Sequence, residues 1–253
     1  MKCIQINEKN IAHEHICCAI GNDKINKARS RTKKEWLQTC LNHGLVFKRL
    51  DDRGKMFIEY MPVAQAWKPV KGSYMLINCL WVSGKFKDKG IAATLLEECI
   101  RDTTEQGLDG IVVVTSPKKR PFLTDKKFFI HKGFTVADQA PPYFELLVLP
   151  SRANAEVPRF TGNARNGTCK DVEGFTFLYS NQCPFTEEYV LSSARLLARR
   201  AIPHTVHKIT SSAEAKTIGS PFGTLGIYYK GQLVTHELMP EKKFLKFITA
   251  ITL

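Results

Sequence analysis

The chain has 253 residues, enough for two domains of ordinary size. Its 37 Lys and Arg residues against 24 Asp and Glu give a formal net charge of +13 at pH 7, which favours an anionic partner such as a nucleotide cofactor. No run approaches 18 consecutive apolar residues, which excludes a membrane-spanning helix, and no Lys- and Arg-rich helix carries interleaved aromatic residues, which makes nucleic acid a minor alternative.

The eight cysteines are spread along the chain without a CxxC pair or a zinc-binding spacing. With no charged-then-apolar leader in the first ten residues, this usage predicts a reduced, cytoplasmic setting. The segment 10–20 suggests metal ligands because it contains His13, Glu14, His15, Cys17 and Cys18. Their spacing matches no metal site of known geometry, so we expect a helix with mixed faces there and no bound metal.

The first secondary-structure elements follow from apolar periodicity. Residues 32–41 predict a helix that ends near Gly44, and two strands over 45–50 and 55–61 are joined by a hairpin turn at 51–54. The helix is expected to bury Trp36, Leu37, Cys40 and Leu41.

The most informative stretch is 74–99, which predicts a strand, a turn and a helix. The apolar strand 74–82 ends at a turn containing Lys85, Lys87 and Lys89, and the amphipathic helix begins at Gly90. The N–H groups at the helix start have no helical partner, and together with the helix dipole they form an anion site. The small residues Gly90 and Ala92 allow a ligand to approach the backbone closely. The turn therefore suits a pyrophosphate.

The run from Val82 to Ala92 resembles the acetyl-CoA signature of the GNAT N-acetyltransferases. That pattern is Arg or Gln, two residues, Gly, one residue, then Gly or Ala, and Lys87, Gly90 and Ala92 take its three places. The alternative is an ordinary strand-turn-helix with solvated lysines. The resemblance implies an α/β domain over 1–150, the GNAT fold, in which a mixed central sheet is flanked by helices. It also implies acetyl-CoA as cosubstrate.

The same resemblance implies which residues contact acetyl-CoA. Backbone groups of Leu80 and Val82 would pair with the pantetheine arm, and the Val82 N–H would polarise the thioester carbonyl. Phe129 stands where many relatives carry a Tyr that protonates the leaving thiolate, and a phenyl ring cannot donate that proton. The expected contacts are Leu80, Trp81, Val82, Lys87, Asp88, Lys89, Gly90, Ile91, Ala92, Ser116 and Phe129.

Few residues can serve as acid or base. Acetyl transfer requires a deprotonated amine, and the candidates for its base are Glu59, Glu145 and His131, with Tyr143 as a proton donor. Each also has a structural interpretation, as an ion pair, an edge-strand charge, a surface imidazole or a packing ring.

The first domain is predicted to finish with three elements: a buried strand over 110–116, a helix over 125–132 with Thr124 as N-cap, and a strand over 143–149. The following segment, 151–173, is rich in Pro, Gly, Asn and Arg and is predicted to be a linker.

Residues 174–253 predict a smaller α/β domain. Strands are expected at 175–179, 202–209, 226–229 and 232–236, with helices after residue 186 and over 241–251. This order resembles the thioredoxin fold. In the resemblance, Cys183 lies at a helix start as in single-cysteine glutaredoxins, Thr186 replaces the resolving Cys, and Pro221 matches the cis-proline that faces the thiol.

Both halves together resemble acetyltransferases that carry a YoaP-like C-terminal domain. We therefore predict an N-acetyltransferase in which the amine of a small molecule or peptide attacks acetyl-CoA directly. The alternative function is a thiol-binding or redox module centred on Cys183, in which the first half only binds acyl-CoA. The sequence favours neither a monomer nor a homodimer and does not identify the acceptor.

Overall fold

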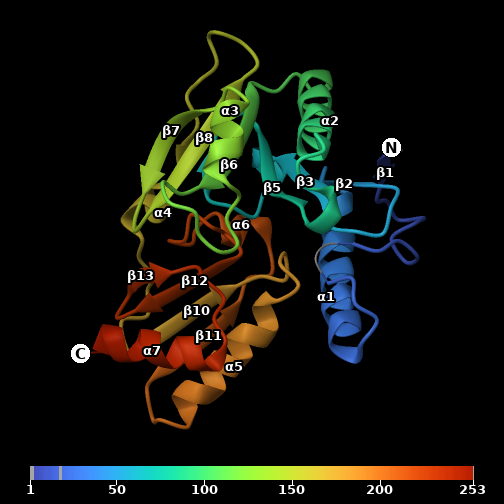
Figure 1. Cartoon of the computed structure of the whole chain (residues 1–253). Helices are drawn as coiled ribbons and strands as arrows, with labels where there is room; N and C mark the ends of the chain where they lie inside the picture. The colour runs from blue at the N-terminus through green and yellow to red at the C-terminus, as the bar shows by residue number, and fades with distance from the viewer. Residues whose placement is uncertain (1–2, 17–18, 253) are drawn as a thin grey trace. The chain divides into compact units, whose positions relative to one another are not determined.

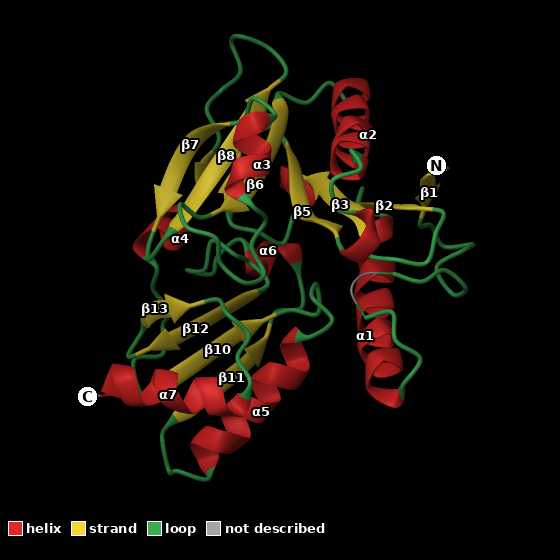
Figure 2. Cartoon of the chain, viewed as in Figure 1, coloured by secondary structure: helices red, strands yellow, loops and turns green. Residues whose placement is uncertain are grey.

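The computed structural model describes residues 3–16 and 19–252, and the chain divides into two compact units. The first unit comprises the chain up to Ala66 together with Val70–Gln139 and Tyr143–Phe160. The second comprises Trp67–Pro69, Ala140–Pro142 and the chain from Thr161. Each unit combines strands with helices (Figures 1 and 2).

The first unit is built on a seven-stranded mixed sheet in the order β1-β2-β3-β5-β6-β8-β7. Strands β5 and β6 are parallel, whereas β1–β2, β2–β3, β3–β5 and β6–β8 are antiparallel. The strands are β1 (Cys3–Gln5), β2 (Val46–Leu50), β3 (Met56–Pro62), β5 (Met75–Val82), β6 (Gly110–Thr115), β7 (Thr135–Ala140) and β8 (Phe144–Pro150). Short strands β4 (Val70–Lys71) and β9 (Arg159–Phe160) pair separately.

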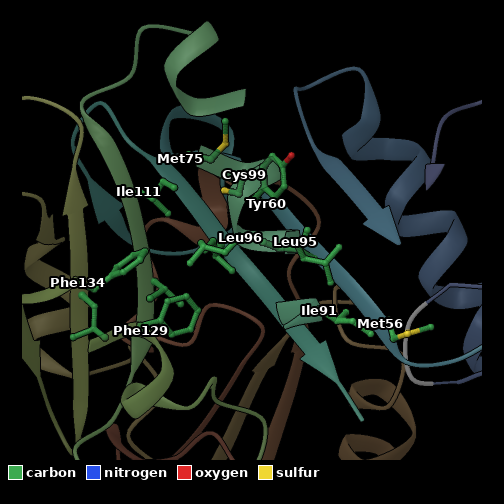
Figure 3. Packing of buried hydrophobic residues seen from close by; sticks show 14 of the residues in the cluster. Met56, Tyr60, Met75, Ile91, Leu95, Leu96, Cys99, Ile111, Phe129 and Phe134 are labelled. Carbon is green, nitrogen blue, oxygen red and sulfur yellow. The ribbon is translucent and has the colours of Figure 1, made fainter. Parts of the chain in front are cut away.

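Helix α2 (Ile91–Glu105) covers one face of this sheet through its apolar side. Its residues Ile91, Leu95, Leu96 and Cys99 pack in one buried cluster with residues of β3, β5 and β6 (Figure 3). Phe129, from helix α3 (Lys126–His131), belongs to the same cluster. This packing fixes where the start of α2 lies relative to β5.

Helix α1 (Lys24–Leu41) contacts the opposite face. Side chains alternate along a strand, so Glu59 of β3 points away from Ile58 and Tyr60, which face α2. Lys33 of α1 reaches Glu59, with 2.5 Å between Nζ and Oε2, and both side chains are buried. A buried ion pair therefore joins α1 to the sheet.

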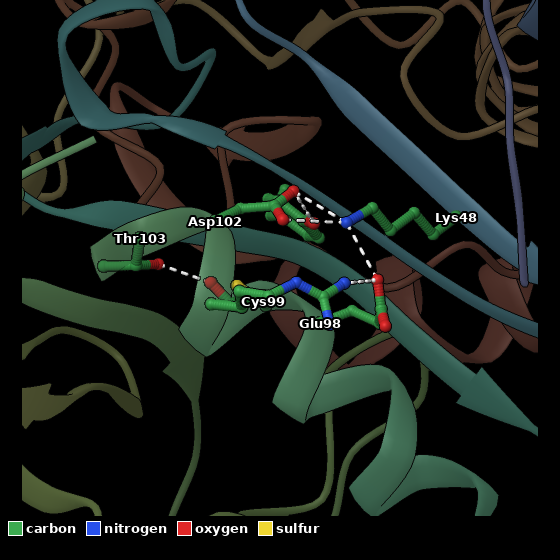
Figure 4. Close-up of polar contacts among 7 residues, drawn as sticks. Lys48, Glu98, Cys99, Asp102 and Thr103 are labelled. Carbon is green, nitrogen blue, oxygen red and sulfur yellow. Dashed lines mark hydrogen bonds and ion pairs between the residues drawn. The ribbon is translucent and has the colours of Figure 1, made fainter. Parts of the chain in front are cut away.

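A second charged cluster ties α2 to β2 (Figure 4). Lys48 Nζ lies 2.8 Å from Asp102 Oδ2 and 3.0 Å from Glu98 Oε2, and Tyr60 donates its hydroxyl to Asp102 Oδ2 at 2.5 Å. Burial, followed by the bond to Asp102, raises the pKa of Tyr60. Arg101 also pairs with Glu98 from the surface.

The second unit contains a four-stranded sheet in the order β11-β10-β12-β13. Strands β10 and β11 are parallel and flank helix α5 in sequence, whereas β10–β12 and β12–β13 are antiparallel. Its elements are α4 (Gly162–Asn166), β10 (Phe175–Tyr179), α5 (Thr186–Ala198), β11 (His204–Lys208), α6 (Ser212–Ala215), β12 (Leu225–Tyr229), β13 (Gln232–Thr235) and α7 (Glu241–Thr252).

Several predicted elements differ from the structure. The described residues between 10 and 20 form turns and irregular chain, so the helix expected there is wrong. Helix α1 begins at Lys24 rather than 32, because Asp23 caps it by accepting the Asn26 N–H at 3.0 Å. Helix α3 is capped by Asp125, not Thr124. Strands β1 and β7 were not predicted.

Two differences concern the second half of the chain. The predicted linker 151–173 contains β9 and α4 and lies partly in each unit. The only cis peptide bond among the described residues joins Pro141 and Pro142. The bond before Pro221 is therefore trans, and the prediction of a cis-proline there is wrong.

Replacing Lys48 by Met should lower the free energy of unfolding by about 2 kcal/mol, because the half-buried carboxylates of Glu98 and Asp102 lose their buried cationic partner. Urea unfolding would measure the loss. Arg101→Met is the matched control: Arg101 also pairs with Glu98, but its side chain is 56% exposed, so the expected loss is below about 1 kcal/mol. Equal losses in the two variants would contradict this role of Lys48.

The same cluster predicts a pH dependence. Hydrogen bonds from Arg101 and then from Lys48 lower the pKa of Glu98. A lowered folded-state pKa stabilises the fold above the unfolded value of about 4.3, and the contribution disappears as pH falls through the folded value. The stability difference between the native chain and Lys48→Met should therefore shrink in acid, as followed by urea unfolding at pH 7 and pH 3.

Candidate functional site

Strands β5 and β6 separate part of the way along their length. Their register pairs Met75 with Ile111 and Ile77 with Val113, and no later residue of either strand is paired with the other in the described chain. On its other side β5 continues beside β3. The register of this pair shifts at Asn78, because Glu59 is paired with Cys79 and Tyr60 with Ile77. The later halves of β5 and β6 therefore enclose a gap in the hydrogen-bonding direction of the sheet.

The backbone of β5 presents free groups to this gap. The Ser83 N–H donates to the Lys55 carbonyl at 3.1 Å, on the side of β3. Because backbone groups alternate along an extended strand, the N–H groups of Val82 and Leu80 point to the opposite side, toward the gap. An extended ligand could pair with them as a neighbouring strand would, because backbone groups seek partners.

The start of α2 is open to an anion. Gly90 is the N-cap in the left-handed conformation (φ 73°), and no side chain caps the helix. Asp88 is also left-handed (φ 60°), so this turn contains consecutive N–H groups in an anion-binding arrangement. A Cβ added to Gly90 would meet no atom within 4 Å, which leaves space for a ligand. Lys87 and Lys89 are exposed beside it.

Two polar side chains near the gap have unused hydrogen-bonding capacity. The side-chain amide atoms of Asn78 are buried, as is the Thr115 hydroxyl, and none has a hydrogen-bond partner within the described part of the chain. Asn78 lies one residue beyond the last β5–β6 pair and Thr115 two residues beyond it. No sequence motif marks either residue, although Asn78 interrupts an otherwise apolar strand.

Three of the four candidate acid-base residues occupy different surroundings. Glu59 is buried against Lys33, on the face away from α2. Glu145 is paired in register with Thr115, and its Oε2 lies 2.7 Å from Lys126 Nζ. The half-buried ring of Tyr143 lies 3.6 Å from the Arg120 guanidinium. Both carboxylates are level with the gap, because Glu59 is paired in register with Cys79 of β5. Only Glu145 lies on the face of the sheet that α2 covers, since it alternates with Leu147 of the buried cluster.

The remaining predicted cofactor contacts divide between core and surface. Phe129 is 1% exposed and packs edge-on against Phe128 and Phe134, so its ring is part of the core. Ser116 is buried and donates its hydroxyl to the Lys118 carbonyl at 2.7 Å. Trp81 is 37% exposed. Ile91 is a core residue, so only its backbone is available at the turn, whereas the half-buried Ala92 follows it on the first turn of α2.

Other candidates lie away from this site. His131 is exposed on α3. Glu14 is paired with Arg49, and Cys17 and Cys18 of the same segment lie outside the described residues. Cys183 belongs to the second unit, where it is half-buried. In the described ranges, no helix combines the length and apolar character needed to cross a membrane.

Comparisons with known proteins give one extensive similarity. The chain is 38% identical over 249 residues to the N-acetyltransferase YoaP of Bacillus subtilis (strain 168), covering 98% of both chains. A model of the YoaP-like family matches residues 203–246.

Similarities to solved structures are weaker. The PaiA N-acetyltransferase of Thermoplasma acidophilum, solved with coenzyme A, is 15% identical, with a TM-score of 0.41, over 58% of this chain and 98% of its own. The ribosomal-protein-S18-alanine N-acetyltransferase of Escherichia coli is 12% identical, with a TM-score of 0.38, over 61% and 98%.

Proposed function

Because the chain belongs to the YoaP family of N-acetyltransferases, we propose that it transfers the acetyl group of acetyl-CoA to the amine of a small molecule or peptide. The observation that carries the assignment of the site is the separation of β5 from β6 beside an uncapped helix start. A narrow cofactor with a diphosphate at one end and a thiol arm at the other suits this pair of features.

The diphosphate would be held by the turn Lys87–Ala92. Its N–H groups and the dipole of α2 favour negative charge, and the open space at Gly90 allows a close approach. Lys87 and Lys89 add positive charge at the surface. This assignment rests on backbone geometry, which explains why lysine in place of the arginine or glutamine of the GNAT pattern is compatible with binding.

The thiol arm would occupy the gap between the strands. The backbone groups of Leu80 and Val82 would pair with its amides, and the Val82 N–H would polarise the thioester carbonyl. Asn78 and Thr115 would supply further hydrogen bonds there, because their polar atoms are buried without partners in the described chain. Trp81 and Ser116 flank the same strand ends.

Chemistry would proceed by direct attack. The acceptor nitrogen bonds to the thioester carbonyl carbon as the carbon–sulfur bond breaks, and the electron pair leaves with the sulfur as a thiolate. Most of the rate enhancement would come from holding the two reactants together. We assign the base to Glu145 rather than Glu59, because Glu145 lies on the face that α2 covers and its partner Lys126 is partly exposed, whereas Glu59 is buried against Lys33 on the other face. Tyr143 is the remaining proton donor.

For the second unit we propose a thioredoxin-like fold. Supporting it are the strand order β11-β10-β12-β13, the parallel β10–β11 pair around α5, and the closing helix α7. The trans bond before Pro221 is a departure from that fold.

The binding proposal predicts that Gly90→Asp raises the Kd for acetyl-CoA at least tenfold, as measured by calorimetry. The new carboxylate would repel the diphosphate and compete for the same N–H groups. Gly107→Asp is the matched control, since Gly107 is also left-handed (φ 64°), open to solvent and next to α2, but at its other end. Equal effects on Kd in the two variants would contradict the assigned site.

The catalytic proposal predicts that Glu145→Gln lowers kcat by about 100-fold or more while binding of acetyl-CoA is kept. Release of the coenzyme A thiol in the presence of a panel of amines would measure it. The control is Lys33→Met with Glu59→Gln, which removes both members of the buried pair and avoids a lone buried charge. Loss of transfer in this folded double variant, with Glu145→Gln active, would reassign the base to Glu59.

A further inference from the structure

Helix α3 carries no hydroxyl group that could protonate a leaving thiolate. Its residues Lys126–His131 read KKFFIH. Phe129 is 1% exposed in the core, and a phenyl ring has no proton to donate. In the proposed acetyl transfer, the proton for the coenzyme A sulfur must therefore come from another group beside the gap between β5 and β6.

Lys126 is the first residue of α3, three positions before Phe129, so the two side chains are neighbours on the helix surface. The helix lies over β6 and β8 (Figure 1), since Phe129 belongs to the same buried cluster as Val113 and Leu147. The Lys126 side chain is 27% exposed. Its ammonium therefore lies at the margin of the core, on the face of the sheet that α2 also covers.

This ammonium is paired with the carboxylate that we assign as the base. Lys126 Nζ lies 2.7 Å from Glu145 Oε2, and Gln139 Nε2 donates to Glu145 Oε1 at 3.4 Å. An ammonium has three N–H donors, and Glu145 is the one partner of Lys126 Nζ within the described part of the chain. Lys126 therefore retains donors for a further acceptor.

The pair of Lys126 and Glu145 lies beside the gap. Glu145 is directly opposite Thr115 in the β6–β8 register, which brings their Cβ atoms to about 5 Å on the same face of the sheet. Thr115 is two residues beyond the last β5–β6 pair, on the strand that borders the gap. An ammonium and a carboxylate in contact with each other therefore stand next to the proposed path of the thiol arm.

The other cations near this end of the sheet are less suited to donate a proton. The Arg120 guanidinium lies 3.6 Å from the Tyr143 ring, and arginine does not release its proton at neutral pH. Lys127 is exposed. His131 is also exposed and lies at the other end of α3.

We propose that Lys126 is the general acid of acetyl transfer and forms a proton relay with Glu145. The neutral amine attacks the thioester carbon, and Glu145 takes a proton from its nitrogen. As the carbon–sulfur bond breaks, the electron pair leaves with the sulfur, which takes a proton from the Lys126 ammonium. The proton on Glu145 then passes to the Lys126 amine across their contact, so both groups return to their starting forms.

This relay rests on the proposed function and makes Lys126, rather than Tyr143, the proton donor. Its net effect is to move one proton from the acceptor nitrogen to the sulfur of coenzyme A. General acid catalysis of this kind contributes about 100-fold or more to a rate. It also explains how a chain with phenylalanine at position 129 could release coenzyme A as a thiol.

The test compares two substitutions of Lys126 in the full chain. Lys126→Arg keeps a positive charge beside Glu145 but has no proton to release, whereas Lys126→Met removes both. We expect both variants to lower kcat by about 100-fold or more, as measured by release of the coenzyme A thiol with a panel of amines. The Kd for acetyl-CoA, measured by calorimetry, should show that both variants still fold and bind.

Lys127→Arg is the matched control, because it makes the same change at the exposed neighbouring position. Its kcat should equal that of the native chain. A native kcat in Lys126→Arg would overturn the acid role, since a positive charge alone would then suffice, and would leave Tyr143 as the donor.

A second measurement needs no acceptor. Ultraviolet absorbance gives the thiolate fraction of coenzyme A bound to the chain at pH 8. A nearby positive charge favours the thiolate, so this fraction should exceed that of free coenzyme A in the native chain and in Lys126→Arg, and should fall at least about threefold in Lys126→Met. Equal fractions in the native chain and Lys126→Met would overturn the placement of Lys126 beside the sulfur. Failure of the native chain to bind coenzyme A would instead overturn the proposed function.

Discussion

The candidate site depends on the early end of pairing between β5 and β6. A strand in the middle of a sheet normally satisfies its backbone on both sides, and leaving N–H and carbonyl groups unpaired is costly. Here β5 continues beside β3 while its other side is released after Ile77. In the proposed site, a ligand that presents amides along an extended arm would take the place of the missing strand.

This arrangement works only if α2 is held firmly over the separated strands. Its apolar side is buried against both β5 and β6, and Lys48 ties its later turns to β2 through Glu98 and Asp102. The left-handed turn at Gly90 then sets the helix start beside the end of β5. Apolar packing supplies most of the attraction, whereas the charged cluster restricts how the helix can slide or rotate.

The sequence predicts the strand, turn and helix around Gly90 well, because apolar periodicity and glycine positions are local signals. The sequence does not predict elements with a weak apolar pattern, or contacts between residues that are far apart in the chain. Most residues of β7 are exposed or half-buried, and the strand mixes polar with apolar residues. The start of α1 is largely polar. The importance of Asn78 becomes visible only with the register of β5. The contacts of Lys68 and His236 with Phe222 join residues far apart in the chain, which no local pattern reveals.

The second unit is assembled from three separate stretches of chain, two of which, Trp67–Pro69 and Ala140–Pro142, are only three residues long. Lys68 is one of the residues contributed in this way. A gene encoding only the final stretch would therefore lack part of its own domain. Joining the final stretch end to end to another protein would leave out Trp67–Pro69 and Ala140–Pro142. We therefore expect the two units to be inherited together.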